Sequence, residues 1–462
     1  MAPLSVEDVV RGTQGALVAG DLGVAVTGVS IDSRSLAIGE AFFAIQAGRD
    51  GHDFLRDAAA HGAACLVVHN LPDDLPPSVP TILVDDTTRA LGRLAAYHRA
   101  RFTLPVAAVT GSNGKTTTKE MMAAVLAALG PVLKPEGSFN NQWGLPLTLL
   151  KLGPAHRAVA LELGANTPGE IEALAAISRP TVGVVTVVQG AHTERFGSLD
   201  GVATEKSALV RAIPPDGAVV LNADDPLVLA MREQSRARVF YYGTRLGGDV
   251  AAVGPVADGP DGLRFTLAIG RARRPVRLAF AGRHNVTNAL AAAGAGLALG
   301  LTPEQIAHGL ETARPVKGRC VWRPAGRLRI LDDTYNANPG SVGAALQTLA
   351  DTSEGRRRVV VLGDMLELGE ISEAAHREMG RTVAASGAAE FVGMGRWAQV
   401  AVEAARQAGL AESHHVTTFE DAVALLLKRL APGDAVLVKG SRGMRMERVV
   451  DALVARFGGE DA

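Results

Sequence analysis

Short apolar runs bounded by glycine or polar turns recur along the chain, and stretches with a helical repeat of apolar residues lie between them. Runs of this kind predict buried strands, and strands that alternate with helices predict mostly parallel sheets covered on both faces. The expected strands are 41–45, 64–68, 81–84, 105–109, 157–163, 182–188, 218–221, 238–242, 328–331, 359–362, 390–392 and 435–438, and the expected helices include 87–101, 119–126, 285–299, 303–311 and 446–456.

The order of these elements predicts three α/β domains, which agrees with a length of 462 residues at about 150 residues a domain. Their expected bounds are 1–84, 85–312 and 313–462. We expect a small α/β first domain, a central parallel-sheet domain and a doubly wound, Rossmann-like third domain. Within the central domain, residues 250–281 change to alternating strands with glycine turns, which predicts a small antiparallel addition.

One stretch organises the central domain: the apolar run 105–109 is followed by Thr-Gly-Ser-Asn-Gly-Lys-Thr-Thr and then by a helix. A strand, a glycine-rich loop and a helix N-terminus form a phosphate-binding loop, because backbone N–H groups and the helix dipole point at the anion. In the usual spacing a glycine stands where this chain has Val109, so the loop is a variant. The expected nucleotide contacts are Gly111, Ser112, Asn113, Gly114, Lys115, Thr116 and Thr117, with Lys115 on the β- and γ-phosphates and the Thr116 hydroxyl on Mg²⁺.

Composition narrows the classes of function. The net charge is −1, which gives no electrostatic argument for a nucleic-acid or membrane partner. Cys65 and Cys320 fit no metal spacing and no disulfide framework, which favours the reducing cytoplasm. The first residues do not resemble a signal peptide, and no apolar run is long enough to predict a membrane span.

Polar residues follow the strands that flank the phosphate-binding loop. Glu162 comes near the end of the run 157–163, and His192 comes shortly after the run 182–188. Ligands of such sheets bind at the carboxyl ends of the strands, so a carboxylate and an imidazole there are candidates for a divalent metal or a phosphate. A solvated carboxylate and a structural histidine are the alternatives.

Lys206 is unusual because it shares one helical face with Val202, Leu209 and Val210. A lysine on an apolar stripe either extends its ammonium to the surface or has a lowered pKa through desolvation. A neutral amine can add CO₂ to form a carbamate, whose oxygens can bind Mg²⁺.

Two clusters of amides are further candidates. Asn140 and Asn141 precede an expected helix, where they can hold phosphate or substrate oxygens or simply cap the helix. Asn285 and Asn288 are three residues apart at the start of another helix, where they can bind an adenine edge or act as caps.

Charged residues mark both ends of the third domain. Arg319 and Asp333 lie close to the hinge with the central domain, so they can contact phosphate and ribose when the domains close. The segment Lys439-Gly440-Ser441-Arg442-Gly443 follows the last strand and is a second anion-binding candidate or a basic turn.

Taken together these motifs resemble the Mur ligase family, whose members are ATP-dependent amide-forming enzymes of peptidoglycan synthesis. The resemblance covers nearly the whole chain. It rests on DSR at 32–34, DGH at 50–52, the phosphate-binding loop, NNQWGLPLTLL at 140–150, ELGANTPGE at 162–170, AHTERFGS at 191–198, GRHNVTNA at 282–289, DDTYNANPGS at 332–341 and LGDMLELG at 362–369. TYNANP and NNQWGLPLTLL are characteristic of the step that adds D-alanyl-D-alanine to UDP-N-acetylmuramoyl-tripeptide.

The resemblance implies which domain binds which substrate. The first domain would bind the UDP end of the muramoyl substrate, the second ATP, and the third would bring D-alanyl-D-alanine. Lys115, Glu162, His192 and Lys206 match the catalytic positions, and Thr116, Glu162, His192 and Lys206 match the Mg²⁺ positions, with Lys206 as a carbamate. Asn285, Asn288, Arg319 and Asp333 would contact the nucleotide, and Ser33, Arg34, Asn140, Asn141, Asn336 and Asn338 the substrates. The family commonly has Gly-Glu after that lysine, whereas this chain has Ser207-Ala208.

The implied reaction forms an acyl phosphate from ATP and the substrate carboxylate, and the dipeptide amine then displaces phosphate. We expect a cytoplasmic monomer without a nucleic-acid partner or stable membrane insertion. Two alternatives remain: another ligase of the same superfamily, such as a folylpolyglutamate or earlier Mur type, and a nucleotide-binding switch without ligase chemistry.

Overall fold

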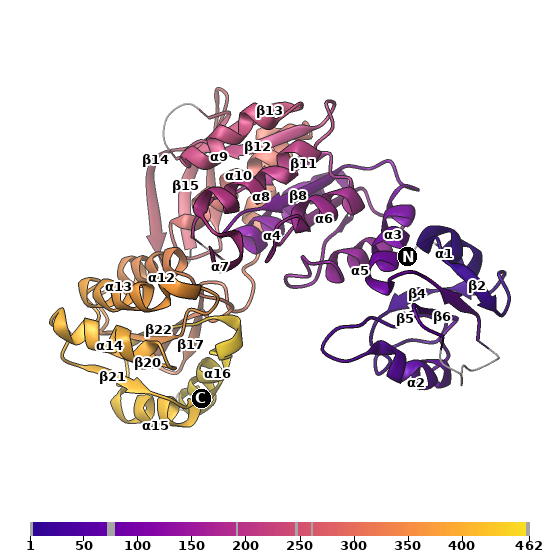
Figure 1. Cartoon of the computed structure of the whole chain (residues 1–462). Helices are drawn as coiled ribbons and strands as arrows, with labels where there is room; N and C mark the ends of the chain where they lie inside the picture. Colours follow the sequence, from indigo (N-terminus) through magenta and orange to yellow (C-terminus); the bar gives the residue numbers. More distant parts are fainter. Residues whose placement is uncertain (1–2, 72–78, 191–192, 245–247, 260–261, 459–462) are drawn as a thin grey trace.

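A computed structural model describes residues 3–71, 79–190, 193–244, 248–259 and 262–458 of the chain. It contains three large sheets of five, nine and six strands, and each of the three predicted domains contains one of them. In Figure 1 the first and third sheets lie on opposite sides of the central one. The predicted class, a three-part α/β protein with parallel-dominated sheets, is therefore confirmed.

The first sheet has the strand order β2-β7-β6-β5-β4, in which only the β2–β7 pair is antiparallel. Its strands are β2 (Ala16–Ala19), β4 (Gly28–Ser30), β5 (Glu40–Phe43), β6 (Cys65–Val68) and β7 (Thr81–Leu83). The short strands β1 (Leu4–Ser5) and β3 (Ala25–Val26) form a separate antiparallel pair, and the helical segments are α1 (Val6–Thr13), η1 (Gly51–Phe54) and α2 (Leu55–Ala60).

The central sheet has the strand order β16-β15-β14-β13-β12-β11-β8-β10-β9. Neighbours are parallel from β14 to β9, whereas β14, β15 and β16 pair antiparallel, as the pattern in residues 250–281 predicted. The strands are β8 (Val106–Thr110), β9 (Val132–Leu133), β10 (Ala158–Glu162), β11 (Val182–Val185), β12 (Ala218–Asn222), β13 (Arg238–Gly243), β14 (Val250–Gly259), β15 (Gly262–Ile269) and β16 (Ala272–Leu278).

Helices cover both faces of this sheet (Figure 1). They are α3 (Thr87–Arg99), α4 (Lys115–Leu126), α5 (Gly144–Leu150), α6 (Glu170–Ser178), α7 (Thr193–Phe196), α8 (Leu199–Ala212), α9 (Pro226–Ala230), α10 (His284–Ala298) and α11 (Pro303–Thr312), with short 3₁₀ turns η2 (Ala127–Leu129) and η3 (Met231–Gln234). Alternate residues of β8 enter different cores: Val106 and Ala108 face one cluster, and Ala107 and Val109 face the other. An apolar run without polar alternation is what such a doubly covered strand requires.

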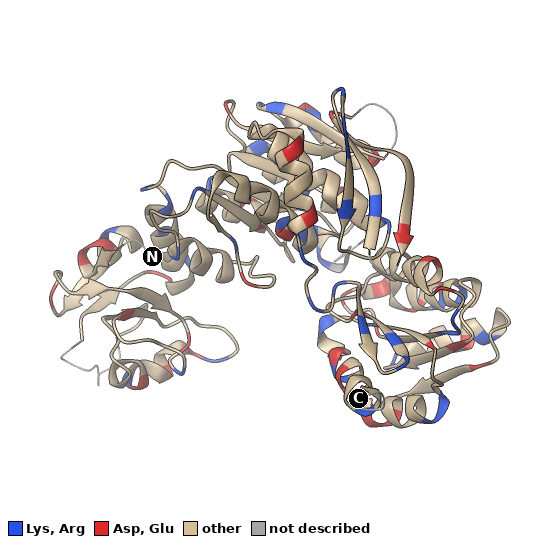
Figure 2. Ribbon diagram, turned by 180° about the vertical axis from the view of Figure 1, so that it is seen from behind, with Lys and Arg blue, Asp and Glu red and all other residues tan. Residues whose placement is uncertain are grey.

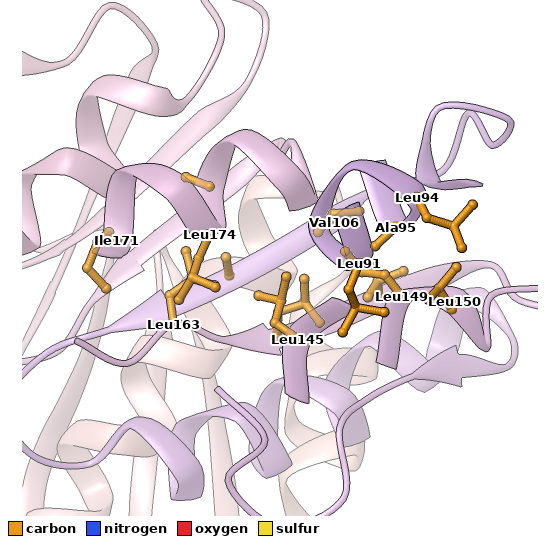
Figure 3. Packing of buried hydrophobic residues seen from close by; sticks show 14 of the residues in the cluster. Leu91, Leu94, Ala95, Val106, Leu145, Leu149, Leu150, Leu163, Ile171 and Leu174 are labelled. Atoms are coloured by element: carbon orange, nitrogen blue, oxygen red, sulfur yellow. The ribbon is translucent and has the colours of Figure 1, made fainter. Parts of the chain in front are cut away.

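The first of these cores extends from the central sheet to the first one. Helix α3 packs against α1 on one side and against α5 and α6 on the other. Figure 3 shows Leu91 and Leu94 of α3 beside Leu145 and Leu149 of α5. This continuous apolar packing joins the first unit to the central sheet.

The third sheet has the order β17-β18-β22-β19-β20-β21 and is parallel except for the edge pair β17–β18. Its strands are β17 (Val321–Ala325), β18 (Leu328–Asp333), β19 (Arg358–Gly363), β20 (Glu390–Met394), β21 (Ser413–Val416) and β22 (Ala435–Lys439). The helical segments are α12 (Pro339–Thr352), η4 (Gly369–Ile371), α13 (Ser372–Ala385), α14 (Ala398–Gln407), α15 (Phe419–Arg429), η5 (Arg442–Met444) and α16 (Glu447–Phe457).

Charged residues of both signs are interspersed over the three units (Figure 2), in agreement with the small net charge. In the described part of the chain, no helix has the length and apolar character needed to cross a membrane. The expected cytoplasmic location and monomeric state stay predictions.

Candidate active site between the central and third sheets

The phosphate-binding loop lies at the carboxyl end of β8, and neighbouring strands fix its backbone. Glu162 pairs in register with Val109, and Thr110 with Val185, so the ends of β10 and β11 flank the loop. The Ser112 N–H donates to the Val187 carbonyl at 2.7 Å. Three adjacent parallel strands therefore place their polar end residues around one point.

The two glycines of the loop are required by its geometry. Gly111 and Gly114 have φ of +148° and +82°. A Cβ on Gly111 would lie 1.9 Å from the Thr186 hydroxyl oxygen, and one on Gly114 would lie 2.2 Å from Asn288 Oδ1. Helix α4 begins directly after Gly114, four residues earlier than expected, so its first N–H groups belong to the loop and are available to an anion.

A cavity of about 670 Å³ opens over this loop. Its walls come from both sides: the phosphate-binding loop, Glu162 and the start of α10 on the central side, and Arg319, Asp333, Asn336, Asn338 and the segment 439–443 on the third side. The position agrees with the rule that ligands of open α/β sheets bind beyond the carboxyl ends of the strands.

Lys115 is only partly buried, and its ammonium donates to the Gly111 carbonyl at 2.7 Å and the Ser112 carbonyl at 3.3 Å. Burial lowers the pKa of Lys115, the charge of Arg319 lowers it further, and Glu162 opposes both. The ammonium therefore lies within the cavity wall and is held by backbone oxygens of the loop itself.

Glu162 is 1% exposed, and its two carboxylate oxygens differ. Oε1 accepts from the Asn140 amide at 2.7 Å, whereas the buried Oε2 has no hydrogen-bond partner among the described residues. A buried carboxylate oxygen without a partner is costly, and a divalent cation would satisfy it. The buried Oε2 of Glu162 thus fits the role of an oxygen ligand for the expected Mg²⁺. The described residues contain no cluster of three His, Cys, Asp or Glu side chains that would hold an ion by themselves.

Lys206 lies on the buried face of α8 with 3% exposure, as its pattern indicated. Desolvation lowers its pKa to about 7, the charge of Lys115 adds to the effect, and Glu205 and Glu170 oppose it. Its ammonium is 5.8 Å from the centre of the Phe196 ring. Lys206 does not extend to the surface, and it is not one of the described residues that line the cavity. His192 lies outside the described residues.

The amides of the central side have different partners. Asn140 orients Glu162, whereas Asn141 Oδ1 accepts from the N–H groups of Trp143 and Gly144 and so holds the turn that leads into α5. Asn285 donates to the Ala281 carbonyl and accepts from Asn288, and both amides line the cavity.

Residues of the third unit contact the loop directly. Arg319 donates to the Thr116 hydroxyl at 3.0 Å, and its guanidinium lies 3.7 Å above the Tyr335 ring. Asn338 and Asn113 exchange two amide hydrogen bonds of 2.8 and 3.2 Å. The two sheets are thus connected at the phosphate-binding loop itself.

Lys439 does not offer a free cation to an anion. It is 2% exposed and donates to Asp333 Oδ2 at 2.6 Å and to the Asn336 carbonyl at 2.7 Å. Asp333 also accepts from the Cys320 N–H at 3.1 Å. Lys439 therefore holds the segment that carries Asp333 and Asn336, while the exposed Arg442 of the same loop lines the cavity.

Ser33 and Arg34 lie in the first unit, away from the residues that line this cavity. Arg34 pairs with Asp32 at 2.6 Å and, through hydrogen bonds, lowers the Asp32 pKa to about 2, whereas Ser33 is buried. The structure does not bring these two residues to the nucleotide loop.

Several cavity residues were missed from the sequence. Ser138, Gln189, His284 and Tyr335 all line it. Gln189 directly follows the expected strand 182–188, and Tyr335 lies between Asp333 and Asn336, so strand-end position was an available signal for both. Ser138 had none, because its contact with the Tyr335 hydroxyl joins segments 197 residues apart.

Comparison with known proteins agrees with the sequence motifs. Three family models match the chain: the Mur ligase family catalytic domain at 25–99, the Mur ligase middle domain at 109–296 and the Mur ligase glutamate ligase domain at 318–442. The UDP-N-acetylmuramoyl-tripeptide–D-alanyl-D-alanine ligase of Mycobacterium bovis is 39% identical over 93% of this chain and 92% of its own.

Solved structures agree as well. MurF from Acinetobacter baumannii superimposes with a TM-score of 0.90 at 34% identity, covering 98% of this chain and 99% of its own. MurF ligase from Thermotoga maritima, solved in complex with ADP, gives a TM-score of 0.82 at 26% identity over 93% and 98% of the two chains. Identity of this extent over nearly the full length confirms the expectation drawn from the motifs: the chain belongs to the Mur ligase family.

Proposed function

We propose that this protein is an ATP-dependent ligase that joins D-alanyl-D-alanine to UDP-N-acetylmuramoyl-tripeptide. The observation that carries the proposal is the cavity between the central and third sheets, where the phosphate-binding loop faces residues of the TYNANP segment. Relatives named for this reaction, at 33–39% identity, support the choice of substrates.

The reaction so proposed has two steps. The terminal carboxylate of the tripeptide attacks the γ-phosphorus of ATP, which forms an acyl phosphate and releases ADP. The amine of D-alanyl-D-alanine then attacks the acyl carbon, phosphate leaves, and the amine loses a proton. Both steps need groups that hold phosphate and exclude water, since the acyl phosphate would otherwise hydrolyse.

Lys115 and the N–H groups at the start of α4 would hold the phosphates in this scheme. The ammonium of Lys115 would exchange the carbonyls of Gly111 and Ser112 for phosphate oxygens. Two anions must meet in the first step, so positive charge at the transferred phosphate stabilises the transition state. Arg319, which already contacts Thr116, would add a second charge from the third unit.

Mg²⁺ would be held by Glu162 and the Thr116 hydroxyl, with His192 as a further proposed ligand. When bound, the ion neutralises phosphate charge and orients the phosphate oxygens. Asn140 fixes Glu162 through Oε1, which leaves Oε2 for the ion. Asn285 and Asn288 are proposed contacts of the nucleotide, since both line the cavity and Asn288 lies beside Gly114.

Lys206 is proposed to act as a carbamate. Its burial and its lowered pKa favour the neutral amine that adds CO₂. Lys206→Ala is expected to abolish phosphate release, and a short carboxylate such as acetate is expected to restore part of it. Bicarbonate should not restore activity, because alanine offers no amine. Full activity of the alanine variant would refute the proposal.

The identity of the amine substrate is tested by replacing D-alanyl-D-alanine with single amino acids. Product formation from UDP-N-acetylmuramoyl-tripeptide and ATP is measured by mass spectrometry with D-alanyl-D-alanine, glycine, glutamate or diaminopimelate at equal concentration. We expect a new amide only with D-alanyl-D-alanine. Formation of the glutamate or diaminopimelate product instead would assign the chain to another ligase of the superfamily.

A further inference from the structure

A fully buried lysine lies on the nucleotide helix, one turn beyond Lys115. Lys119 is 0% exposed, and its ammonium donates to the carbonyls of Pro135 at 3.0 Å and Gly137 at 2.8 Å. It also pairs with Glu120 at 2.6 Å. Burial of an ammonium is unfavourable unless its donors are satisfied, and here two carbonyls and one carboxylate satisfy them.

The segment that Lys119 holds has no regular secondary structure. It connects β9 to α5, and residues 134–139 belong to no sheet or helix. Its next residues carry two contacts of the site: Ser138 bonds the Tyr335 hydroxyl of the third unit, and Asn140 orients Glu162. The ammonium of Lys119 thus holds the carbonyls of Pro135 and Gly137, directly before Ser138, and the Asn140 carbonyl accepts separately from the Gly164 N–H at 2.9 Å.

In the third unit, the residue that meets Ser138 is linked through Arg319 to helix α4. Tyr335 lies beneath the guanidinium of Arg319, and Arg319 donates to Thr116 of α4. A closed ring of contacts therefore begins at Lys119 on α4, passes through Ser138, Tyr335 and Arg319, and ends at Thr116 on α4. Each link is a hydrogen bond, an aromatic–cation contact or a short stretch of backbone.

We propose that Lys119 is a positioning residue that couples the nucleotide helix to the docking of the third unit. It touches neither the cavity nor a proposed substrate. It fixes the 135–140 segment so that Ser138 meets Tyr335 while Asn140 holds Glu162. The effect of Lys119 on kcat and KM rests on the proposed function, whereas its effect on backbone hydrogen exchange does not.

Lys119→Met tests this proposal, because methionine keeps an unbranched side chain but removes the donors. We expect kcat to fall and the KM for D-alanyl-D-alanine to rise, together by about tenfold or more, as expected for loss of a charged hydrogen bond. The affinity for ADP should stay within about twofold, since the loop of residues 111–116 is unchanged. Lys134→Met is the matched control: Lys134 also pairs with Glu120, but its side chain is 46% exposed, and we expect wild-type kinetics.

A second variant removes only the link to the third unit. Ser138→Ala should raise the same KM, and in the double variant the two effects should not add, because both break one path. If Lys119→Met does not fold, Ser138→Ala decides: wild-type kinetics for this variant would overturn the proposal. Additive effects of the two substitutions on the KM in the double variant would also overturn it. A loss of ADP affinity in Lys119→Met as large as its loss of kcat/KM would overturn it as well.

Hydrogen exchange gives a readout that needs no substrate. In Lys119→Met, the backbone N–H groups of residues 136–140 and those around Tyr335 should both exchange faster than in wild type and in Lys134→Met. Faster exchange confined to residues 136–140 would show a local structural role and overturn the coupling. If instead the wild type itself releases no phosphate in response to the dipeptide, the proposed function fails, and exchange still decides the role of Lys119.

Discussion

At the scale of single residues, the charged side chains of the site differ in how many hydrogen-bond partners they have. Lys439 has two strong acceptors, and Lys115 has two carbonyls of its own loop, whereas Glu162 keeps one buried oxygen without a described partner. Buried groups that lack a partner are expensive, and such groups are often found where a ligand binds. This imbalance supports Glu162, rather than Lys439, as a ligand-binding position.

Asp258 gives a prediction of pH dependence at this scale. Desolvation raises its pKa to about 6, and the nearby Asp351 adds to this, while the Gly282 N–H and Arg283 oppose it. A folded-state pKa above the ordinary 3.8 means that the folded protein binds the proton more tightly than the unfolded chain. The carboxylate therefore costs stability as the pH rises from about 4 to 6, and the full cost remains above that.

Asp258→Asn should consequently be more stable than wild type at pH 7 to 8, because the amide keeps an acceptor for Gly282 without a charge. The difference in melting temperature should shrink on acidification and vanish below about pH 4. Thermal unfolding of both proteins from pH 3.5 to 8 measures it. Parallel curves across that range would contradict the assigned cause.

At the level of secondary-structure elements, the residue that precedes helix α12 has two separate roles. Asn338 is its N-cap, since its side chain accepts from the Ser341 N–H, and the same amide exchanges hydrogen bonds with Asn113. One side chain thus both stabilises the helix of the third unit and joins that helix to the phosphate-binding loop.

Substitution separates the two roles. Asn338→Ser keeps a good capping oxygen but lacks the amide, so its melting temperature should stay near wild type while kcat/KM falls by about tenfold. Asn338→Ala should lose activity similarly and about 1 kcal/mol of stability as well. Steady-state kinetics and thermal unfolding of the two variants measure this. Wild-type kcat/KM in the serine variant would show that the contact with Asn113 has no part in the reaction.

Strands with an uninterrupted apolar run could be predicted from the sequence, whereas some strands interrupted by polar residues or proline could not. The run before the phosphate-binding loop is buried on both faces, so its pattern alone indicated a central strand. Strand β17 contains Arg323 and Pro324, and β21 contains His414 and His415, so neither shows an apolar run; pairing with their neighbours makes them strands. Hydrogen bonding to a neighbouring strand therefore determines these two strands, and the local sequence pattern does not reveal it.

At the scale of the whole molecule, the site exists only where two sheets meet. Lys115 could be predicted because a glycine-rich loop after a recognisable strand leads into its helix, and Glu162 because it ends another recognisable strand. The adjacent amides Asn140 and Asn141 could not be told apart, because which one meets Glu162 depends on a strand elsewhere in the sequence. Contacts between distant segments, such as Asn113 with Asn338, have no local signature at all.

In the proposed function, phosphate transfer in this cavity serves amide formation with D-alanyl-D-alanine. The most direct test is a phosphate-release assay of the purified chain with ATP and Mg²⁺, in which each of the other two substrates is omitted in turn. We predict sustained release only when both UDP-N-acetylmuramoyl-tripeptide and D-alanyl-D-alanine are present. ATP turnover that does not depend on the dipeptide would contradict the proposed ligase function.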